Sequence, residues 1–369
     1  MNQPRRLVLV LNESTPRAAI DWHLALDRLV AEGDLLAYEV VPYLALLADG
    51  LSAASVADQV AAAAERIGGD IVLWAHTHGL HLSDHVIART RGATPHTVMG
   101  YWDGDWYDPY RCPFPREAYR LCSRCDVVFL QGDGALVRSL RRRGCPDVRY
   151  VAATSDERFQ PQPERQHYDF DLVLVGNKIT SRLPLKDFPG NVFRRRLVAH
   201  FERRLGTRFA IFGQGWTGPS AQGPLPFDEQ ATAYGTALAG LGCNNWFTRY
   251  YFSNRLPISM SSARPVIHFK DAGYDEVFGS DPGIYWFRDV EQAWRQFRFV
   301  MDHYTEAQDA AQCVQELARQ RFTTYHAVAY MVRVLDSLAA GREGTASSVV
   351  QNPWIGKVRL SGARAQRSV

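Results

Sequence analysis

Histidine and carboxylate side chains follow two apolar runs in the first half of the sequence, where those runs end. His76 and His78 follow one run, and Asp103 and Asp105 follow the next. If the runs are parallel strands, these residues lie at the carboxyl edge of a sheet, where open α/β proteins bind small molecules. Asp or His can there deprotonate a hydroxyl group. We expect a general base at this edge, with Asp103 and His78 as first candidates, Asp105 and His76 next, and Glu13 after the first strand as a third possibility.

Each of these residues also has a structural interpretation. A histidine at a strand end is often simply hydrogen-bonded, and Asp103-Gly104 is a common turn dipeptide. Three aromatic residues lie among the carboxylates: Trp102, Trp106 and Tyr107. Their rings would offer a flat apolar platform to the ring of a bound molecule.

A metal site is the competing interpretation of the histidines. His76, His78 and His81 are closely spaced, with Asp84 and His85 just behind, and imidazoles two residues apart on a strand are a common ligand spacing. A metal-dependent hydrolase would use such a cluster. However, Asp84 and His85 fall in a predicted helix, and a hydrolase leaves the second half of the chain without a role. The hydrolase therefore remains the alternative interpretation.

The second half carries its own polar and glycine residues at predicted strand ends. Glycine lets a backbone approach a ligand closely, and helix N-termini and basic groups bind phosphates. Arg255 is the strongest phosphate candidate because its guanidinium can bind two oxygens at once. The full candidate set for a phosphorylated ligand is Gly176, Asn177, Lys178, Arg182, Gly213, Gln214, Asn244, Ser253, Asn254 and Arg255.

The elements that must position these residues form an α/β pattern that runs twice. A polar, Pro-containing stretch over 154–168 separates the halves. The apolar strand runs are continuous rather than alternating, which is typical of parallel sheets covered by helices on both faces. The sequence thus predicts two doubly wound domains, residues 1–160 and 161–322. A closing helix from Glu306 to about Ala339 should bend near 323–326 and return to the first domain, so that 323–369 forms a crossover helix and tail.

The composition excludes several classes of protein. The chain has 369 residues with 42 basic and 39 acidic side chains, a net charge of +3, which argues against a dedicated nucleic-acid binder. We find no signal peptide and no apolar segment long enough to span a bilayer, and the six scattered cysteines suggest free thiols. We therefore expect a cytoplasmic protein, whose basic tail could make weak contact with a membrane surface.

Three segments carry a resemblance to a known family. They are Tyr251–Ile267, Gly273–Phe278 and Gly283–Asp289. Together with the glycines at strand ends, they resemble the C-terminal half of GT-B glycosyltransferases, of the family 1 or 4 type and in particular the spore-maturation CgeB-like branch. The resemblance implies two facing Rossmann-like domains. The second would bind a nucleotide-diphosphate sugar, the first an acceptor, and the glycosyl group would pass between them across a cleft without a metal or other cofactor.

One position departs from that family. Many relatives carry a Glu that is taken to hold the nucleotide ribose, and the aligned residue here is Ile258. Either another residue, such as Asp275 or Glu276, makes this contact, or the donor is held differently. The departure keeps open a second interpretation, a GT-B-like scaffold or sensor that binds a nucleotide sugar without turnover.

Overall fold

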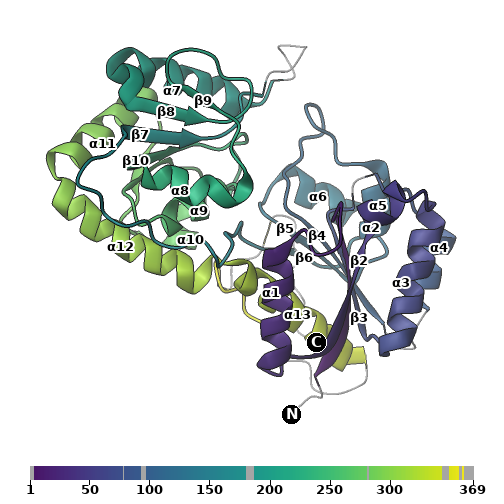
Figure 1. The fold of residues 1–369 in the computed structure, drawn as a ribbon. Helices are drawn as coiled ribbons and strands as arrows, with labels where there is room; N and C mark the ends of the chain where they lie inside the picture. Colours follow the sequence, from purple (N-terminus) through teal and green to yellow (C-terminus); the bar gives the residue numbers. More distant parts are fainter. Residues whose placement is uncertain are drawn as a thin grey trace, which may run out of the picture. The chain divides into compact units, whose positions relative to one another are not determined.

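The chain folds into two compact units, each built on one sheet (Figure 1). The computed structural model describes residues 4–77, 79–92, 97–179, 187–280, 282–342, 349–356 and 360. The first unit comprises Met1–Val151 with Thr324–Val369, and the second comprises Ala152–Thr323. The first boundary therefore falls before residue 160, and the polar stretch that follows it belongs to the second unit. The two sheets confirm the predicted α/β class with two Rossmann-like domains.

The sheet of the first unit has six parallel strands in the order β2-β1-β3-β4-β5-β6. The strands are β1 (Arg5–Leu11), β2 (Leu35–Pro42), β3 (Ile71–Ala75), β4 (Val98–Asp103), β5 (Val127–Leu130) and β6 (Val148–Tyr150). The helices are α1 (Ile20–Ala31), α2 (Tyr43–Ala48), α3 (Ala53–Ile67), α4 (Asp84–Arg91), α5 (Arg116–Cys122), α6 (Ala135–Arg142) and α13 (Thr324–Arg342). Helices α1 and α13 cover one face, and α3 and α4 cover the other (Figure 1). All of β3 is buried for this reason.

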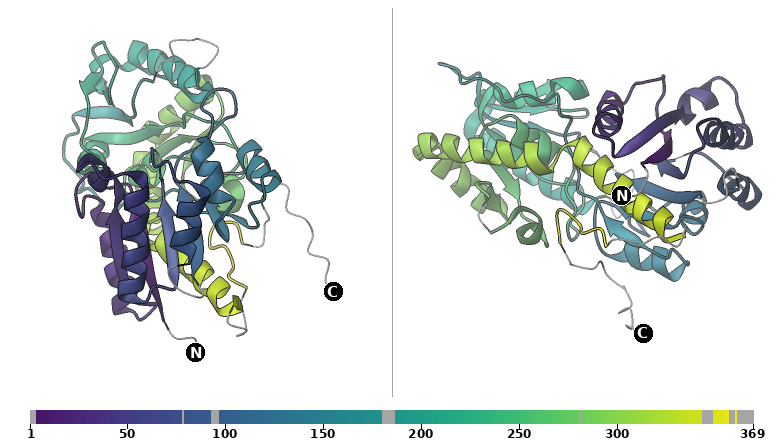
Figure 2. Two further views of the ribbon diagram at one scale, coloured as in Figure 1. Left: turned by 90° about the vertical axis from the view of Figure 1, so that its right-hand side faces the viewer. Right: turned by 90° about the horizontal axis from the view of Figure 1, so that it is seen from below.

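Helix α13 packs closely on β4 of the first sheet. A Cβ atom at Gly100 would lie 3.0 Å from Cδ2 of Leu335, so glycine at this position allows the helix to approach. Helix α12 (Tyr304–Arg321) ends three residues before α13 begins at Thr324. The long C-terminal helical pattern is thus two helices, broken where the sequence predicts a bend (Figure 2).

The sheet of the second unit has the order β12-β11-β10-β7-β8-β9, and all of its pairs are parallel. The strands are β7 (Phe170–Val175), β8 (Phe209–Phe212), β9 (Ala221–Gly223), β10 (Ala237–Gly242), β11 (Val266–Phe269) and β12 (Tyr285–Phe287). Besides α12, the helices are α7 (Pro189–Leu205), α8 (Gln230–Gly235), α9 (Arg255–Ser261), α10 (Tyr274–Phe278) and α11 (Val290–Asp302), with 3-10 turns at Gly206–Arg208 and Phe227–Glu229.

Strand β7 shows why this sheet is buried on both sides. Leu172 and Leu174 point into an apolar cluster shared with α7 and α11. Val173 and Val175 point the other way, into a cluster with Tyr234 of α8 and with α9. Successive side chains of a strand alternate between faces, so a continuous apolar run buries apolar side chains on both faces of the sheet. This arrangement fixes the ends of β7 and β8, where the candidate ligand residues lie.

Local sequence signals set several helix ends. The Ser52 hydroxyl accepts a hydrogen bond from the Ser55 amide before α3, and the Asp289 carboxylate accepts one from the Gln292 amide before α11. Helix α9 begins only at Arg255, because Tyr251 to Ser253 form a separate loop. The sequence did not predict α2, β9 or α10, which are all short.

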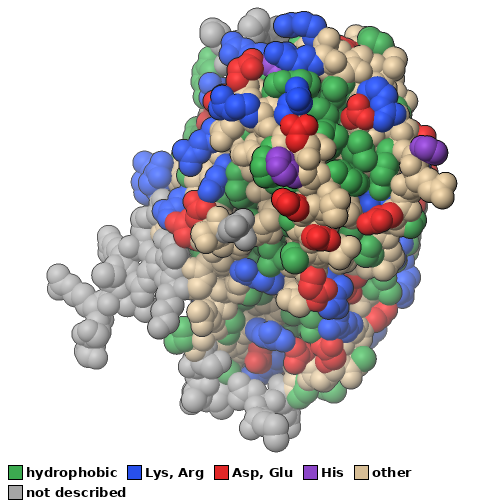
Figure 3. Space-filling model, turned by 90° about the vertical axis from the view of Figure 1, so that its left-hand side faces the viewer, with side chains coloured by type: hydrophobic (Ala, Val, Ile, Leu, Met, Phe, Trp, Pro, Cys, Tyr) green, Lys and Arg blue, Asp and Glu red, His purple; other side chains and the backbone are tan. Residues whose placement is uncertain are grey.

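Charge is spread evenly over the face shown in Figure 3, where basic and acidic side chains are interspersed. This mixture agrees with the near balance of 42 basic and 39 acidic residues. Among the described residues, no helix combines the length and apolar character needed to cross a bilayer.

Candidate functional site

A cavity of about 160 Å³ opens in the second unit at the carboxyl ends of β7 and β8. Its lining residues come from these two strand ends, from the loop after β9 and from the starts of α8 and α9. They are Val175, Gly176, Asn177, Phe212, Gly213, Gln214, Pro224, Leu225, Gln230 and Arg255. Five of the ten predicted donor residues therefore line one cavity: Gly176, Asn177, Gly213, Gln214 and Arg255.

Glycine at position 213 makes this geometry possible. Its φ is +151°, and a Cβ there would lie 2.4 Å from the carbonyl oxygen of Gly176, which is shorter than any real contact. The Gly176 amide donates to the Phe212 carbonyl at 2.8 Å, and the Gln214 amide donates to Oδ1 of Asn177 at 2.9 Å. These bonds hold the two strand ends together as one rigid wall of the cavity.

Two arginines bring positive charge to this wall. Arg194 of α7 is 3% exposed, and its guanidinium donates to the carbonyls of Asn177 at 3.0 Å and Cys243 at 2.7 Å. The half-buried Arg255 has no ion pair with any described residue, and its Nε is buried without a hydrogen-bond partner there. Burial and the charge of Arg194 together lower the pKa of Arg255. Excess positive charge around an unpaired guanidinium is suited to an anion.

The other predicted donor residues have different surroundings. Asn244 is fully buried: its side-chain amide donates to Tyr274 Oη at 2.6 Å, and its Oδ1 accepts the Ser253 amide at 3.2 Å. Asn244 thus shapes the loop before α9, and the Ser253 N–H is already occupied. Asn254 precedes α9 without a side-chain capping bond. Lys178 donates its backbone N–H to Gln214 and lies with Nζ 5.6 Å from the Trp216 ring centroid. Arg182 lies outside the described residues.

Position 258 offers no polar group to a ligand. Ile258 is fully buried in the cluster between α8, α9 and β7. The two carboxylates considered as substitutes are engaged elsewhere, since Asp275 accepts a hydrogen bond from Lys270 Nζ at 2.6 Å and Glu276 from Arg249 at 2.8 Å. Neither lines the cavity. The structure therefore gives no support to Asp275 or Glu276 as the ribose contact.

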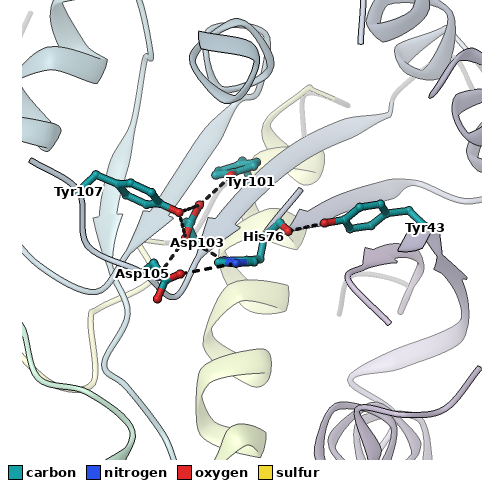
Figure 4. A network of polar contacts seen from close by, with 6 residues as sticks. All are labelled: Tyr43, His76, Tyr101, Asp103, Asp105 and Tyr107. Atoms are coloured by element: carbon teal, nitrogen blue, oxygen red, sulfur yellow. Dashed lines mark hydrogen bonds and ion pairs between the residues drawn. The ribbon is translucent and has the colours of Figure 1, made fainter. Parts of the chain in front are cut away.

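A buried polar network lies at the ends of β3 and β4 in the first unit (Figure 4). Its centre is Asp103, which is 0% exposed. Its carboxylate accepts hydrogen bonds from Tyr101 Oη at 2.8 Å, from Tyr107 Oη at 3.3 Å and from the Asp105 amide at 3.0 Å. Its Oδ1 also lies 3.0 Å from His76 Nδ1. Because a carboxylate only accepts, Nδ1 carries a proton, and in the neutral ring Nε2 is left with the lone pair.

The backbone holds His76 in a fixed position. Its φ is +52°, in the left-handed region that residues other than glycine seldom adopt. The His76 amide donates to the Trp102 carbonyl at 2.8 Å, and its own carbonyl accepts from Tyr43 Oη at 2.8 Å (Figure 4). These bonds on both sides maintain the uncommon conformation. Such strain at a strand end is frequently associated with a functional site.

Charges around His76 adjust its protonation. Burial acts to lower its pKa, but the hydrogen bond and charge of Asp103 and the charge of Asp105 outweigh it and raise the pKa above the ordinary value. His76 Nε2 lies 3.6 Å from Oδ2 of Asp105, whose side chain is 65% exposed. The imidazole is 20% exposed. His76 is thus an oriented histidine that solvent or a ligand can reach on its Nε2 side.

The predicted histidine cluster does not form within the described residues. His81 is exposed and lies 3.4 Å from Glu117, and Asp84 lies 3.6 Å from Arg124. His78 lies outside the described residues. The group with potential metal ligands that the described part contains is His76 with Asp103 and Asp105. Asp103 already accepts hydrogen bonds on both oxygens, which favours a hydrogen-bonded histidine over a metal centre.

Glu13 is engaged with α1 rather than with this network. It is 2% exposed, and its Oε1 accepts the Ala19 amide at 2.8 Å and lies 3.0 Å from Nε2 of His23. This arrangement fixes the turn from β1 into α1. Its Oε2 is buried without a hydrogen-bond partner among the described residues, so a role of Glu13 in ligand binding stays a prediction.

The three predicted platform aromatics differ in exposure. Trp106 and Tyr107 are buried, and the Tyr107 ring packs against Phe114 with centroids 4.9 Å apart. These two rings therefore offer no open platform, and Phe114 covers the Tyr107 ring. Trp102 is half-buried and packs edge-on against Trp22 at 5.0 Å.

Some residues of the two sites were not predicted. Tyr101 could have been found, since it lies two positions before Asp103 on the same face of β4. Arg194 and Gln230 carry no such signal, because their positions depend on helix packing. Arg194 is one of three consecutive arginines on α7, of which it alone is buried.

The chain matches one protein family over part of its length and resembles many solved structures in fold. Residues 194–333 match the family described as "Glycosyl transferase-like". No curated protein matches the chain. HepE from Anabaena, solved with UDP and glucose, is 11% identical with a TM-score of 0.54 over 92% of this chain and 99% of that one. Sucrose-phosphate synthase from Thermosynechococcus elongatus is 11% identical with a TM-score of 0.58, covering 91% and 100%. The T4 phage β-glucosyltransferase is 10% identical with a TM-score of 0.51, covering 90% and 99%.

Proposed function

We propose that this chain, which has the GT-B glycosyltransferase fold and a glycosyl transferase-like segment over residues 194–333, transfers a glycosyl group from a nucleotide-diphosphate sugar to a hydroxyl acceptor. The acceptor oxygen forms a bond to the anomeric carbon, and the bond from that carbon to the diphosphate oxygen breaks. The hydroxyl proton goes to the protein, and the diphosphate leaves with the electron pair. The second unit binds the donor and the first binds the acceptor.

The unpaired guanidinium of Arg255 is the observation that carries this proposal. A buried cation with no acidic partner in the described part of the chain loses hydration without gaining an ion pair, so an anionic ligand would compensate it. The leaving diphosphate gains negative charge in the transition state, and a fixed cation stabilises that charge. Two proteins of similar fold support this ligand class, since HepE and the T4 enzyme were both solved with UDP-glucose. In this proposal Arg255 takes the role of a metal ion.

His76 is the proposed general base, and Asp103 is its positioning residue. With the proton on Nδ1 held by Asp103, Nε2 can accept the proton of an acceptor hydroxyl. A base that activates the acceptor directly implies a single displacement with inversion at the anomeric carbon. A protein that only bound nucleotide sugars would need the Arg255 cavity but no oriented base, so the His76 network favours the enzyme over a scaffold or sensor.

The direct test is release of nucleoside diphosphate from a panel of UDP, GDP and dTDP sugars, with cell extract supplying the acceptor. Proton NMR of the product then reports the anomeric configuration. Release of diphosphate that depends on added extract supports transfer. Release at the same rate with water alone would indicate a hydrolase, and no release from any donor would favour the binding protein.

Nucleotide binding is expected to raise the melting temperature. At a ligand concentration of 100 times Kd, mass action adds about 2.7 kcal/mol to the free energy of unfolding, which corresponds to a shift of a few degrees. We expect UDP to produce this shift in a thermal-shift assay with UDP, GDP, dTDP and CMP. CMP, with one phosphate, serves as the internal control. No shift with any of the nucleoside diphosphates would contradict the donor proposal.

Removing the Asp105 charge is expected to move the pH profile of activity. The carboxylate of Asp105 contributes to the raised pKa of His76, so Asp105→Asn should lower this pKa. A base works in its neutral form, and activity therefore falls as the pH drops through the His76 pKa. The acidic limb of kcat/KM should shift to lower pH in Asp105→Asn. Asp84→Asn, which removes another exposed carboxylate of the same unit, should leave the limb in place. An unshifted limb in Asp105→Asn would exclude His76 as the titrating base.

A further inference from the structure

Two buried polar atoms in the same cavity have no partner. Oε1 of Gln230 and Nε of Arg255 are both inaccessible to solvent, and neither makes a hydrogen bond to the described residues. Both residues line the cavity at the ends of β7 and β8. Leaving a buried polar atom without a hydrogen bond is destabilising, so such atoms usually mark the place of a ligand or water. A ligand that satisfies both atoms must offer a hydrogen-bond donor to Gln230 Oε1 and an acceptor to Arg255 Nε.

The chemistry of the two side chains restricts those groups. Arg255 only donates hydrogen bonds and carries a positive charge, which suits a phosphate oxygen. The Gln230 side chain is a neutral amide, and the best partner for it is a hydroxyl group, which both donates and accepts. Val175, Phe212 and Leu225 supply apolar surface between them. A sugar ring that bears hydroxyls on its edge and C–H groups on its faces fits this lining.

The other lining residues narrow the choice of side chain within this cavity of about 160 Å³. Of the other polar lining residues, Asn177 already accepts the Gln214 backbone N–H through Oδ1, and the Gln214 side chain is exposed. Gln230 differs from both because its Oε1 is buried without a partner among the described residues, so it is our candidate for the sugar contact.

We propose that Gln230 is a specificity-determining residue that binds a ribose hydroxyl of the nucleotide whose phosphate pairs with Arg255. This inference rests on the proposed function and extends it to the ribose. Ile258 and its neighbours Ala231 and Tyr234 form the apolar cluster beneath the start of α8. Gln230 precedes Ala231 on that helix, so it provides a polar group at the cavity where position 258 provides none. The protein thus distinguishes ribonucleotides from deoxyribonucleotides through an uncharged side chain.

Calorimetric titration with UDP and GDP, and with their 2′-deoxy and 3′-deoxy forms, tests this assignment. In the wild-type chain, one deoxy form should bind about 3- to 10-fold more weakly than its parent, as expected for the loss of one hydrogen bond. Gln230→Ala should weaken the binding of the parent nucleotide by a similar factor. It should also abolish the difference in affinity between the parent and this deoxy form. Gln222→Ala, which removes an exposed glutamine of β9 outside the cavity, should change neither affinity.

Binding of inorganic pyrophosphate tests the donor site independently of the Gln230 assignment, because pyrophosphate has no ribose. Gln230→Ala should bind pyrophosphate like the wild type, whereas Arg255→Ala should bind it more weakly. If Gln230→Ala keeps the full discrimination between ribose and deoxyribose, the Gln230 assignment is wrong while the donor site stands. If the wild-type chain binds neither nucleotides nor pyrophosphate, both the proposed donor site and the Gln230 assignment are wrong.

Discussion

Replacing Arg255 with alanine is expected to lower kcat/KM by roughly 30- to 1000-fold. This range corresponds to about 2–4 kcal/mol of lost transition-state stabilisation, the usual effect of removing one preorganised group that faces developing charge. The effect should be large because the guanidinium is half-buried and has no acidic partner in the described residues to share its charge. The loss of kcat/KM is measured by steady-state kinetics, with the donor that the panel of nucleotide sugars has identified.

The matched control is Arg249→Ala. Arg249 is an arginine of the same unit whose guanidinium donates to Glu276 at 2.8 Å in a partly exposed pair. Such pairs contribute about 0–1 kcal/mol, so activity should remain within a few-fold of the wild type. Circular dichroism confirms that both variants are folded. Equal kcat/KM for Arg255→Ala and the wild type would remove Arg255 from the donor site.

His76→Asn is expected to lower kcat by about 10²- to 10⁴-fold, the usual contribution of a general base. Asparagine is the informative substitution for two reasons. It tolerates the left-handed backbone conformation at φ +52°, and its side-chain amide can donate to Asp103 as Nδ1 of the histidine does. The variant therefore removes the base while keeping the network that holds Asp103.

His81→Asn provides the comparison, because His81 is an exposed histidine near Glu117 in the same unit. It should leave kcat unchanged. The binding of UDP measured by thermal shift should be unaffected in both variants, since the proposed donor site lies in the other unit. If His76→Asn retains full activity, the base is another group, and a retaining mechanism without a base becomes the better explanation.

The fold could be predicted because its signals are local. Buried runs such as Leu172–Val175 are apolar at every position, which is typical of strands covered on both faces, and the helices between them have regular apolar stripes. The association of Gly176, Gly213 and Arg255 follows from the same reasoning, since carboxyl ends of neighbouring parallel strands meet at one edge. Short elements such as α2 and α10 have too few residues to give a periodic pattern.

The parts of the sites that could not be predicted depend on packing. Nothing in the sequence shows that Arg194 turns inward while Arg195 and Arg196 do not, because the choice depends on which face of α7 meets the sheet. The burial of Tyr107 similarly depends on Phe114, which a later loop brings over it. The left-handed backbone of His76 is maintained by Tyr43 from a separate helix.

The absence of a carboxylate around Arg255 in the described chain also bears on the end of the catalytic cycle. In the proposed reaction, the free nucleoside diphosphate that remains after transfer carries more negative charge than the donor did. A guanidinium that no acid neutralises holds this more anionic species more tightly than the nucleotide sugar. The same feature that accelerates bond cleavage would therefore make the enzyme sensitive to product inhibition, and release of the nucleotide would become the slow step of turnover.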